Sequence, residues 1–303
     1  MNVVIKVNDE IKEKMIEYYK DKKRDKVIPY VVFQAQDEDT VITMYESGKV
    51  MFQGTSADVD AAMWGVALEN TNEKKEEKKK ENLKYYNAPS VGSDEVGTGD
   101  YYGPIVVTAC FVDKNNLEEL KKLGVGDSKK IDDSKILKIA PQIAKLVKYK
   151  SVILTNKEYN EKYNKDINMN KIKAILHNKV LYQLINEEKP VYEYIIVDEF
   201  AREARYYEYL NGQNNIQKGI TFLTKAEDIS PAVGCASIIS RYIFLKEFDK
   251  LCDSIHMPLP KGAGRDVDEI GEEVVEKYGE DKLKEIAKVN FKNTDRILHT
   301  MIY

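Results

Sequence analysis

The sequence predicts an α/β protein in which a small α+β domain precedes a larger domain of alternating strands and helices. Residues 71–84, TNEKKEEKKKENLK, consist almost entirely of charged and polar side chains that cannot pack a core, so they separate two parts of the chain. After this segment, short β-branched runs alternate with longer segments of helical apolar spacing, which is typical of layered α/β domains. The length of 303 residues accommodates one small and one large domain.

The small domain is expected over residues 1–70, and the charged linker over residues 71–88. Its strand-like runs are short and separated by polar loops, and Ser56 is an N-cap candidate for its second helix. Strands are expected at residues 3–7, 29–36, 40–45 and 49–54, and helices at residues 11–20 and 56–70. These elements predict a sheet with helices on one side.

The large domain is expected over residues 89–303. Strands are expected at residues 91–96, 103–112, 150–155, 192–197 and 219–223, and helices at residues 116–123, 132–148, 168–187, 229–250, 266–278 and 280–288. Only residues 97–102 join the first two strands, and so short a link predicts an antiparallel hairpin.

The composition excludes several classes of protein. The net charge is −4, so the protein has no overall positive field that would indicate a nucleic-acid partner. The three cysteines are widely spaced, which indicates reduced thiols in a cytoplasmic protein and no disulfide framework or zinc site. The three histidines are isolated in the sequence and give no His-rich metal cluster. No signal peptide and no apolar run long enough for a bilayer is present, so no membrane association is expected.

Acidic residues stand at the ends of three predicted elements. Asp94 and Glu95 lie in VGSDEVGTGDYYGPIVV, at the end of the first strand of the large domain. Asp198 ends the run YEYIIVD, and function in layered α/β sheets collects at such strand ends. Glu227 and Asp228 follow a short strand and precede a helix rich in small residues. Each also has a purely structural explanation, as a solvated turn, a strand cap or the start of a tightly packed helix.

Two features of the first acidic pair favour a role in catalysis over a purely structural one. Neighbouring residues of a strand point to opposite faces, so Asp94 and Glu95 can reach one site only where the strand bends or ends. Gly97 and Gly99 allow such a bend. Three separated acidic positions are what divalent-metal chemistry requires, because Mg²⁺ binds a few carboxylates and completes its shell with substrate phosphate. The sequence contains no Ser–His, Cys–His or Walker-loop arrangement that would indicate a different chemistry.

Taken together, these segments resemble the type 2 ribonuclease H superfamily, and within it the ribonuclease HIII family. The motifs that carry the resemblance agree in order and spacing over most of residues 91–298. They are GSDEVGTGDYYGPIVVTA, GVGDSKKIDD, YNEKYNKDINMNKIKAILHNKVL, IIVDEFA, TKAEDISPAVGCASIISRYIFL and LPKGAG. The first domain, with SGKVMFQG, looks like the ribonuclease HIII module that is similar to half of the TATA-binding protein. The related ribonuclease HII lacks this module.

The resemblance implies a ribonuclease H-like mixed sheet flanked by helices and endonucleolytic cleavage of the RNA strand of RNA–DNA hybrids. It implies Mg²⁺ as the cofactor, with Mn²⁺ as a substitute. Matched motif by motif, the metal-binding acids are Asp94, Glu95, Asp198 and Glu227, with Asp228 an open alternative for the fourth. By the same matching, the residues that contact substrate are Gly97, Thr98, Gly99, Ser128 and Lys129. The protein is expected to act as a monomer on a hybrid duplex.

Two departures and three rival functions stay open at this point. Asn290 stands where similar sequences often carry histidine, so no role is transferred to it. The first domain carries more acidic than basic residues, which is awkward for binding a hybrid; residues 14–26 are its one basic stretch. The rivals are ribonuclease HII-type cleavage at single ribonucleotides in DNA, a hybrid-binding protein without catalysis, and a DNA-directed phosphodiesterase.

Overall fold

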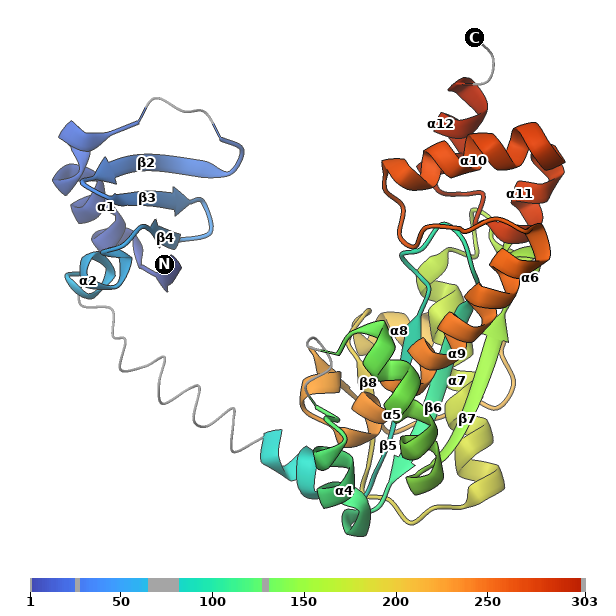
Figure 1. Ribbon diagram of the computed structural model, residues 1–303. Coiled ribbons are helices and arrows are strands. Elements are labelled where there is room, and N and C mark those ends of the chain that lie inside the picture. The colour runs from blue at the N-terminus through green and yellow to red at the C-terminus, as the bar shows by residue number, and fades with distance from the viewer. Residues whose placement is uncertain (1, 25–27, 65–81, 127–130, 301–303) are drawn as a thin grey trace. The chain divides into compact units, whose positions relative to one another are not determined.

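The computed structural model describes residues 2–24, 28–64, 82–126 and 131–300 (Figure 1). The chain divides into two compact units, Met1–Lys80 and Glu81–Tyr303. Most of the expected linker lies outside the described residues. Its last part, residues 82–87, is helical, and Tyr85 is buried in the second unit against the ring of Tyr194, with 5.0 Å between ring centroids. Residues 82–88 therefore pack with the second unit.

The first unit is an antiparallel sheet with helices on one face. In the described residues the strand order is β1-β4-β3-β2. The elements are β1 (Asn2–Lys6), α1 (Asp9–Tyr18), β2 (Val31–Asp37), β3 (Thr40–Tyr45), β4 (Lys49–Gln53) and α2 (Ala57–Ala62). Met15, Phe33, Ile42 and Phe52 are buried in one core between sheet and helices. The predicted α+β architecture is confirmed; the expected end of the second helix falls on residues outside the described part.

The second unit is built on a mixed sheet of order β7-β6-β5-β8-β9. Its strands are β5 (Ser90–Val96), β6 (Ile105–Val112), β7 (Lys148–Leu154), β8 (Tyr194–Asp198) and β9 (Ile220–Leu223). β5, β6 and β7 pair antiparallel, while β5, β8 and β9 run parallel. The expected hairpin of the first two strands is confirmed. The parallel pairing brings the carboxyl ends of β5 and β8 to the same edge of the sheet.

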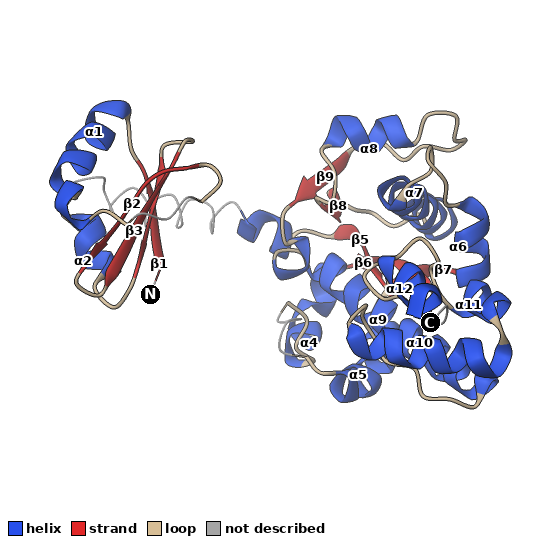
Figure 2. Cartoon of the chain, turned by 90° about the horizontal axis from the view of Figure 1, so that it is seen from above, coloured by secondary structure: helices blue, strands red, loops and turns tan. Residues whose placement is uncertain are grey.

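Helices cover both faces of this sheet, with α9 and α7 on opposite sides (Figure 2). The helices are α4 (Leu117–Lys122), α5 (Asp133–Leu146), α6 (Asn156–Lys162), α7 (Met169–Glu188), α8 (Glu203–Tyr209), α9 (Pro231–Ile255), α10 (Arg265–Tyr278), α11 (Glu280–Ile286) and α12 (Lys292–Thr300). Apolar residues of α5, α9 and α10 share one core, and those of α7 and α8 share the other. No helix in the described part of the chain has the length and apolarity to span a bilayer.

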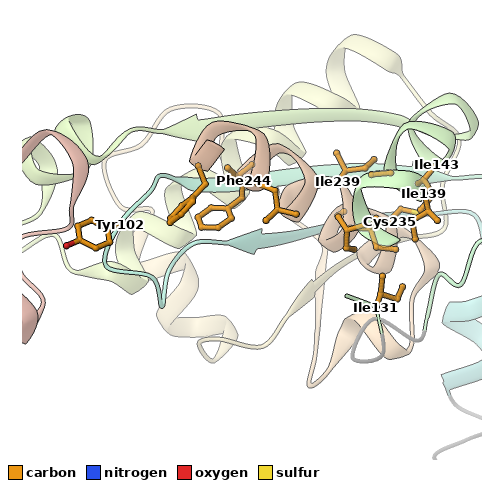
Figure 3. Packing of buried hydrophobic residues seen from close by; sticks show 14 of the residues in the cluster. Tyr102, Ile131, Ile139, Ile143, Cys235, Ile239 and Phe244 are labelled. Carbon is orange, nitrogen blue, oxygen red and sulfur yellow. The ribbon is translucent and has the colours of Figure 1, made fainter. Parts of the chain in front are cut away.

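Small residues let α9 lie directly on β5. Ala232, Cys235 and Ala236 of α9 are fully buried, and Cys235 and Ile239 pack against isoleucines of α5 (Figure 3). A Cβ added to Gly92 of β5 would lie 2.6 Å from the backbone nitrogen of Val233. This close contact fixes the start of α9 against the strand that carries Asp94.

Replacing Gly92 with alanine should lower the free energy of unfolding by about 3 kcal/mol, because backbone cannot yield to the new methyl group. Urea unfolding measures this loss. Gly99→Ala is the matched control, since a Cβ there would have no atom within 4 Å, and its stability should stay within about 0.5 kcal/mol of the parent. Equal stability of the two variants would contradict the packing argument.

Candidate active site

Asp94 and Asp198 lie side by side at one edge of the sheet. The last register pair of the parallel strands β5 and β8 is Ser93 with Val197, and the two aspartates follow it directly. Strands in a sheet lie about 4.8 Å apart, so the two residues are close neighbours. Both face the α9 side: Ser237 hydrogen-bonds the Asp94 carboxylate, and the Ala226 N–H donates to Asp198 Oδ1 at 2.9 Å.

Glu227 reaches the same edge from the 3₁₀ turn Ala226–Asp228, which connects β9 to α9. Its negative charge is among the causes that raise the pKa of Asp94, so it lies near that carboxylate. Glu227 is half-buried, whereas Asp228 is exposed. This geometry favours Glu227 over Asp228 as the fourth acid.

Asp94 is held in an environment that opposes its ionisation. Burial raises the pKa of Asp94 to about 8, and the neighbouring Glu95 and Glu227 carboxylates add to the rise. Hydrogen bonds from Ser237 and from the Glu95 backbone N–H, at 2.8 Å, oppose it. Clustered carboxylates of this kind are relieved by a bound cation.

In a chelating buffer, the titration of Asp94 should therefore lower the free energy of unfolding as the pH rises from about 4 to about 8. Its folded pKa of about 8 exceeds the unfolded value of 3.8, so the native state keeps a proton that the unfolded chain has released, and stability falls as the pH rises. Asp94→Asn should remove this component and be more stable than the parent at pH 8 by about 1–3 kcal/mol. Urea unfolding across this range measures it. The exposed neighbour of Asp198, changed in Glu199→Gln, is the control, and an unchanged pH profile in the Asp94 variant would contradict the expectation.

Glu95 faces the opposite side of β5, toward α7. The Lys173 ammonium lies 2.5 Å from Oε1, and His177 Nε2 lies 2.8 Å from Oε2. Burial alone would raise the pKa of Glu95, but the His177 hydrogen bond and the Lys173 charge outweigh it and lower the pKa to about 2. The strand ends one residue later, and Glu95 lines the groove that follows.

The glycine segment forms one wall of that groove, which has a volume of about 500 Å³. Gly97 has φ +94°, and a Cβ there would lie 2.1 Å from the Pro104 carbonyl oxygen, so the fold itself demands glycine. Gly99 is different, because the space beside its Cα is open. Gly97, Thr98 and Gly99 thus share the groove with Glu95, and Gly99 leaves room for an incoming backbone.

Basic side chains that sequence reasoning did not assign line the same groove. Arg241 of α9 lies 2.6 Å from Asp133, and Lys261 pairs with the same carboxylate. Lys261 lies within the motif LPKGAG, which was a readable signal. The two expected substrate contacts Ser128 and Lys129 lie outside the described residues.

A buried lysine anchors the loop that continues the glycine segment. Lys288 is fully buried and donates to the carbonyl oxygens of Asp100, at 2.7 Å, and Gly103, at 2.6 Å. Burial lowers the pKa of Lys288 to about 7, and the nearby Asp100 carboxylate opposes this shift. The Gly262 N–H donates to Asp100 Oδ1 at 2.6 Å, so the loop is tied at both sides.

The acids at the sheet edge fit a hard divalent cation in chemistry. They offer carboxylate oxygens, which Mg²⁺ and Mn²⁺ prefer, and burial together with the neighbouring carboxylates raises the pKa of Asp94. Among the described residues, no three acidic, histidine or cysteine side chains stand ready as a ligand group. Glu95 and Asp198 each have partners of their own, which are Lys173 and His177 of α7 for Glu95 and the Ala226 N–H for Asp198.

Comparisons with known proteins agree with this architecture. A family model described as Ribonuclease HII matches residues 91–294, and one described as a domain of unknown function (DUF3378) matches residues 2–78. The chain is 40% identical to a ribonuclease HIII of Bacillus mycoides (strain KBAB4) over 304 residues, or 97% of each chain. The crystal structure of Bst-RNase HIII in complex with Mn²⁺ is 35% identical, with a TM-score of 0.71 over 99% of each chain. The Aquifex aeolicus RNase H3 structure, 22% identical with a TM-score of 0.55, shares the fold.

Fold and site define a metal-dependent phosphodiester hydrolase with a ribonuclease H-like sheet. The relatives that match it do so over nearly the full length, including the first unit. The chain belongs to the ribonuclease HIII family. It is an endoribonuclease that hydrolyses the RNA strand of RNA–DNA hybrids with divalent metal.

Proposed function

We propose that Asp94, Asp198 and Glu227 hold the divalent ions of this reaction and that Glu95 completes the set. The observation that carries this assignment is that Asp94 and Asp198 directly follow the last register pair of two adjacent strands, with Glu227 near enough for its charge to raise the pKa of Asp94. A bound Mg²⁺ ion, or Mn²⁺ as a substitute, supplies a more acidic water and stabilises the leaving oxygen. The hydrogen bonds to Ser237 and to the Ala226 N–H keep the two aspartates at the edge.

The glycine segment then positions the RNA strand. Gly97, Thr98 and Gly99 present backbone close to Glu95, and the open side of Gly99 allows a sugar edge to approach. A nuclease specific for hybrids must detect the 2′-OH, which separates RNA from DNA. We assign this contact to the segment 97–99, with Ser128 and Lys129 as further contacts on the basis of their motif.

Arg241 and Lys261 give the groove positive charge for the substrate backbone. Both pair with Asp133, so this cluster of two cations and one carboxylate keeps one positive charge in a groove that Glu95 and Asp100 also line. Phosphate oxygens accept charge-assisted hydrogen bonds from such side chains, and Arg binds them in a bidentate manner. These contacts release counterions, so affinity for the hybrid falls steeply with salt.

The first unit is proposed to bind the hybrid through the open face of its sheet. Register pairs set Val4 beside Met51, Met51 beside Thr43 and Thr43 beside Gln34, which makes a continuous row across the strands. The row is uncharged; Gln34 and Thr43 are buried and hydrogen-bonded to each other, so Val4 and Met51 are the members of the row that can contact sugars. Lys6 and Lys49 pair at one end of the face and supply positive charge. With this arrangement, the first unit can bind the hybrid although it carries more acidic than basic residues.

The basic stretch of the first unit is less suited to this task. Lys14 pairs with Glu10, Lys20 with Glu17, and Lys22 with Asp37, so acids neutralise these lysines. Of the aromatic residues that could stack on sugars, Phe33 and Phe52 are in the core, while Tyr30 is 77% exposed.

We also propose that the enzyme acts as a monomer in the cytoplasm and binds the RNA strand directly. The acids and the groove come from one chain, so no second copy is needed to complete the site. All three cysteines are free, with Cys110 and Cys235 buried, as in a reducing compartment.

A panel of labelled duplexes tests the function. The substrates are an all-RNA strand paired with DNA, a DNA duplex with one ribonucleotide, and pure DNA, each with Mg²⁺ and with Mn²⁺. We expect repeated cleavage of the all-RNA strand and no cleavage of pure DNA. Cleavage only at the single ribonucleotide would indicate ribonuclease HII-type specificity. Binding without any cleavage would indicate a non-catalytic protein, and cleavage of pure DNA would indicate a DNA-directed phosphodiesterase.

A further inference from the structure

Two side chains of α7 hold both oxygens of the Glu95 carboxylate. Lys173 Nζ lies 2.5 Å from Oε1, and His177 Nε2 lies 2.8 Å from Oε2. Residues four apart on a helix share one face, so α7 presents Lys173 and His177 together. The Glu95 and Lys173 side chains are each 12% exposed, and His177 is fully buried. We call Lys173 and His177 the α7 clamp.

The α7 clamp is itself held by the strands that carry the acids. Ser93, two residues before Glu95 on the same face of β5, has its Oγ 2.7 Å from His177 Nδ1. The Lys173 ammonium lies 4.2 Å from the centroid of the Phe200 ring, and the His177 ring stacks on the same ring at 5.4 Å. Phe200 comes two residues after Asp198. The clamp thus contacts the chain beside both central acids.

Stability alone is a poor reason for such an arrangement. Taking a carboxylate and an ammonium out of water costs free energy that their attraction need not recover, so a buried ion pair is weak evidence for stabilisation. Glu95 also lies close enough to Asp94 to raise its pKa, and this repulsion favours turning the Glu95 carboxylate away. Contacts with both carboxylate oxygens prevent the Glu95 side chain from turning. Their main effect is therefore on the orientation of Glu95.

We infer that Lys173 and His177 are positioning residues for the reaction, which hold the Glu95 carboxylate at the rim of the groove so that it can join the acids of the sheet edge. The inference rests on the role proposed above for Glu95. Neither residue touches the substrate or the ions. Ligand-orienting partners of this kind are worth about 10- to 100-fold in metal affinity or activity.

The test begins with Lys173→Met, which keeps the length of the side chain and removes its charge. We expect kcat on the hybrid to fall about 10- to 100-fold. The Mn²⁺ affinity of the protein without nucleic acid, followed by electron paramagnetic resonance of free Mn²⁺, should weaken by a similar factor. Hybrid affinity in a chelating buffer should not change. Lys173→Arg should recover part of both losses, and Lys179→Met, at an exposed lysine of the same helix, should behave as the parent.

A double-variant cycle on Mn²⁺ affinity separates orientation from general structure. In a Glu95→Gln background, Lys173→Met should have no further effect, because the carboxylate that it orients is gone. If the double variant instead lost Mn²⁺ affinity by the product of the two single-variant factors, the inference would be wrong. The same holds if Lys173→Met and His177→Gln both keep the parent kcat and Mn²⁺ affinity while Glu95→Gln is inactive. Full activity of Glu95→Gln would instead remove Glu95 from the site, so the proposed role would fail first and the inference with it.

Discussion

Replacing Asp94 with asparagine should lower kcat for hybrid cleavage by at least about 10³-fold, because the site loses the charge that holds a divalent ion against the scissile phosphate. Asparagine keeps the size of the side chain and an oxygen that can accept the hydrogen bond from Ser237. The start of α9 and the end of β5 should therefore keep their packing. Single-turnover cleavage of an all-RNA strand, with enzyme in excess, measures the chemical step directly.

Binding and folding controls decide what the loss means. Affinity for the hybrid in a chelating buffer should stay within about threefold of the parent, because the substrate contacts proposed for the groove do not include the Asp94 charge. Glu199→Gln, one residue after Asp198 and exposed, should keep full activity. If the Asp94 variant cleaved at the parent rate, Asp94 would not be a metal ligand and the assignment of the sheet edge would be wrong.

The strands of the second unit were predictable because each is specified by a short, local run of residues. Runs such as IIV before Asp198 and IVVTACFV in β6 are β-branched and apolar, as strands buried on both faces require. The hairpin followed from the shortness of its link. Strand ends then located Asp94 and Asp198, although only the parallel register of β5 and β8 shows that they are neighbours.

Three short helices were missed for different physical reasons. α6 begins with a capping box in which Thr155 and Glu158 cap each other, a signal that the sequence contains. α8 is rich in tyrosine, which favours strands, and tertiary packing of Tyr206 overrides that preference. α12 has few turns over which a period can be seen.

The residues around the acids were beyond sequence reasoning, because a lysine gives no local sign of where its ammonium lies. Lys173 stands in a helix rich in lysines, and only its contacts with Glu95 and Phe200 distinguish it. Lys288 lies in a charged C-terminal segment, yet it is fully buried under the glycine loop. His177 reads as a core histidine, which it is, and its contact with Glu95 depends on how α7 packs on β5.

Deleting residues 1–70 should raise KM for the hybrid about 10- to 100-fold and leave kcat at saturation within about threefold, because a second binding surface on the same chain adds affinity without touching the reacting atoms. The deletion removes the core of the first unit and keeps the whole second unit, including the helix that carries Tyr85. The dependence of affinity on salt should also become shallower, since Lys6 and Lys49 are lost.

Point variants on the intact chain show whether the open face of the first unit is responsible. Lys6→Gln with Lys49→Gln should raise KM in the same direction as the deletion, because these two lysines pair across β1 and β4 at the end of the uncharged row. Lys14→Gln is the matched control, since that lysine is exposed on α1 and already paired with Glu10. A KM that the deletion leaves unchanged would mean that the second unit alone binds the hybrid. A large fall in kcat at saturation would mean that the first unit acts on the chemistry itself, so the ratio of the two effects decides how the reaction divides between the units.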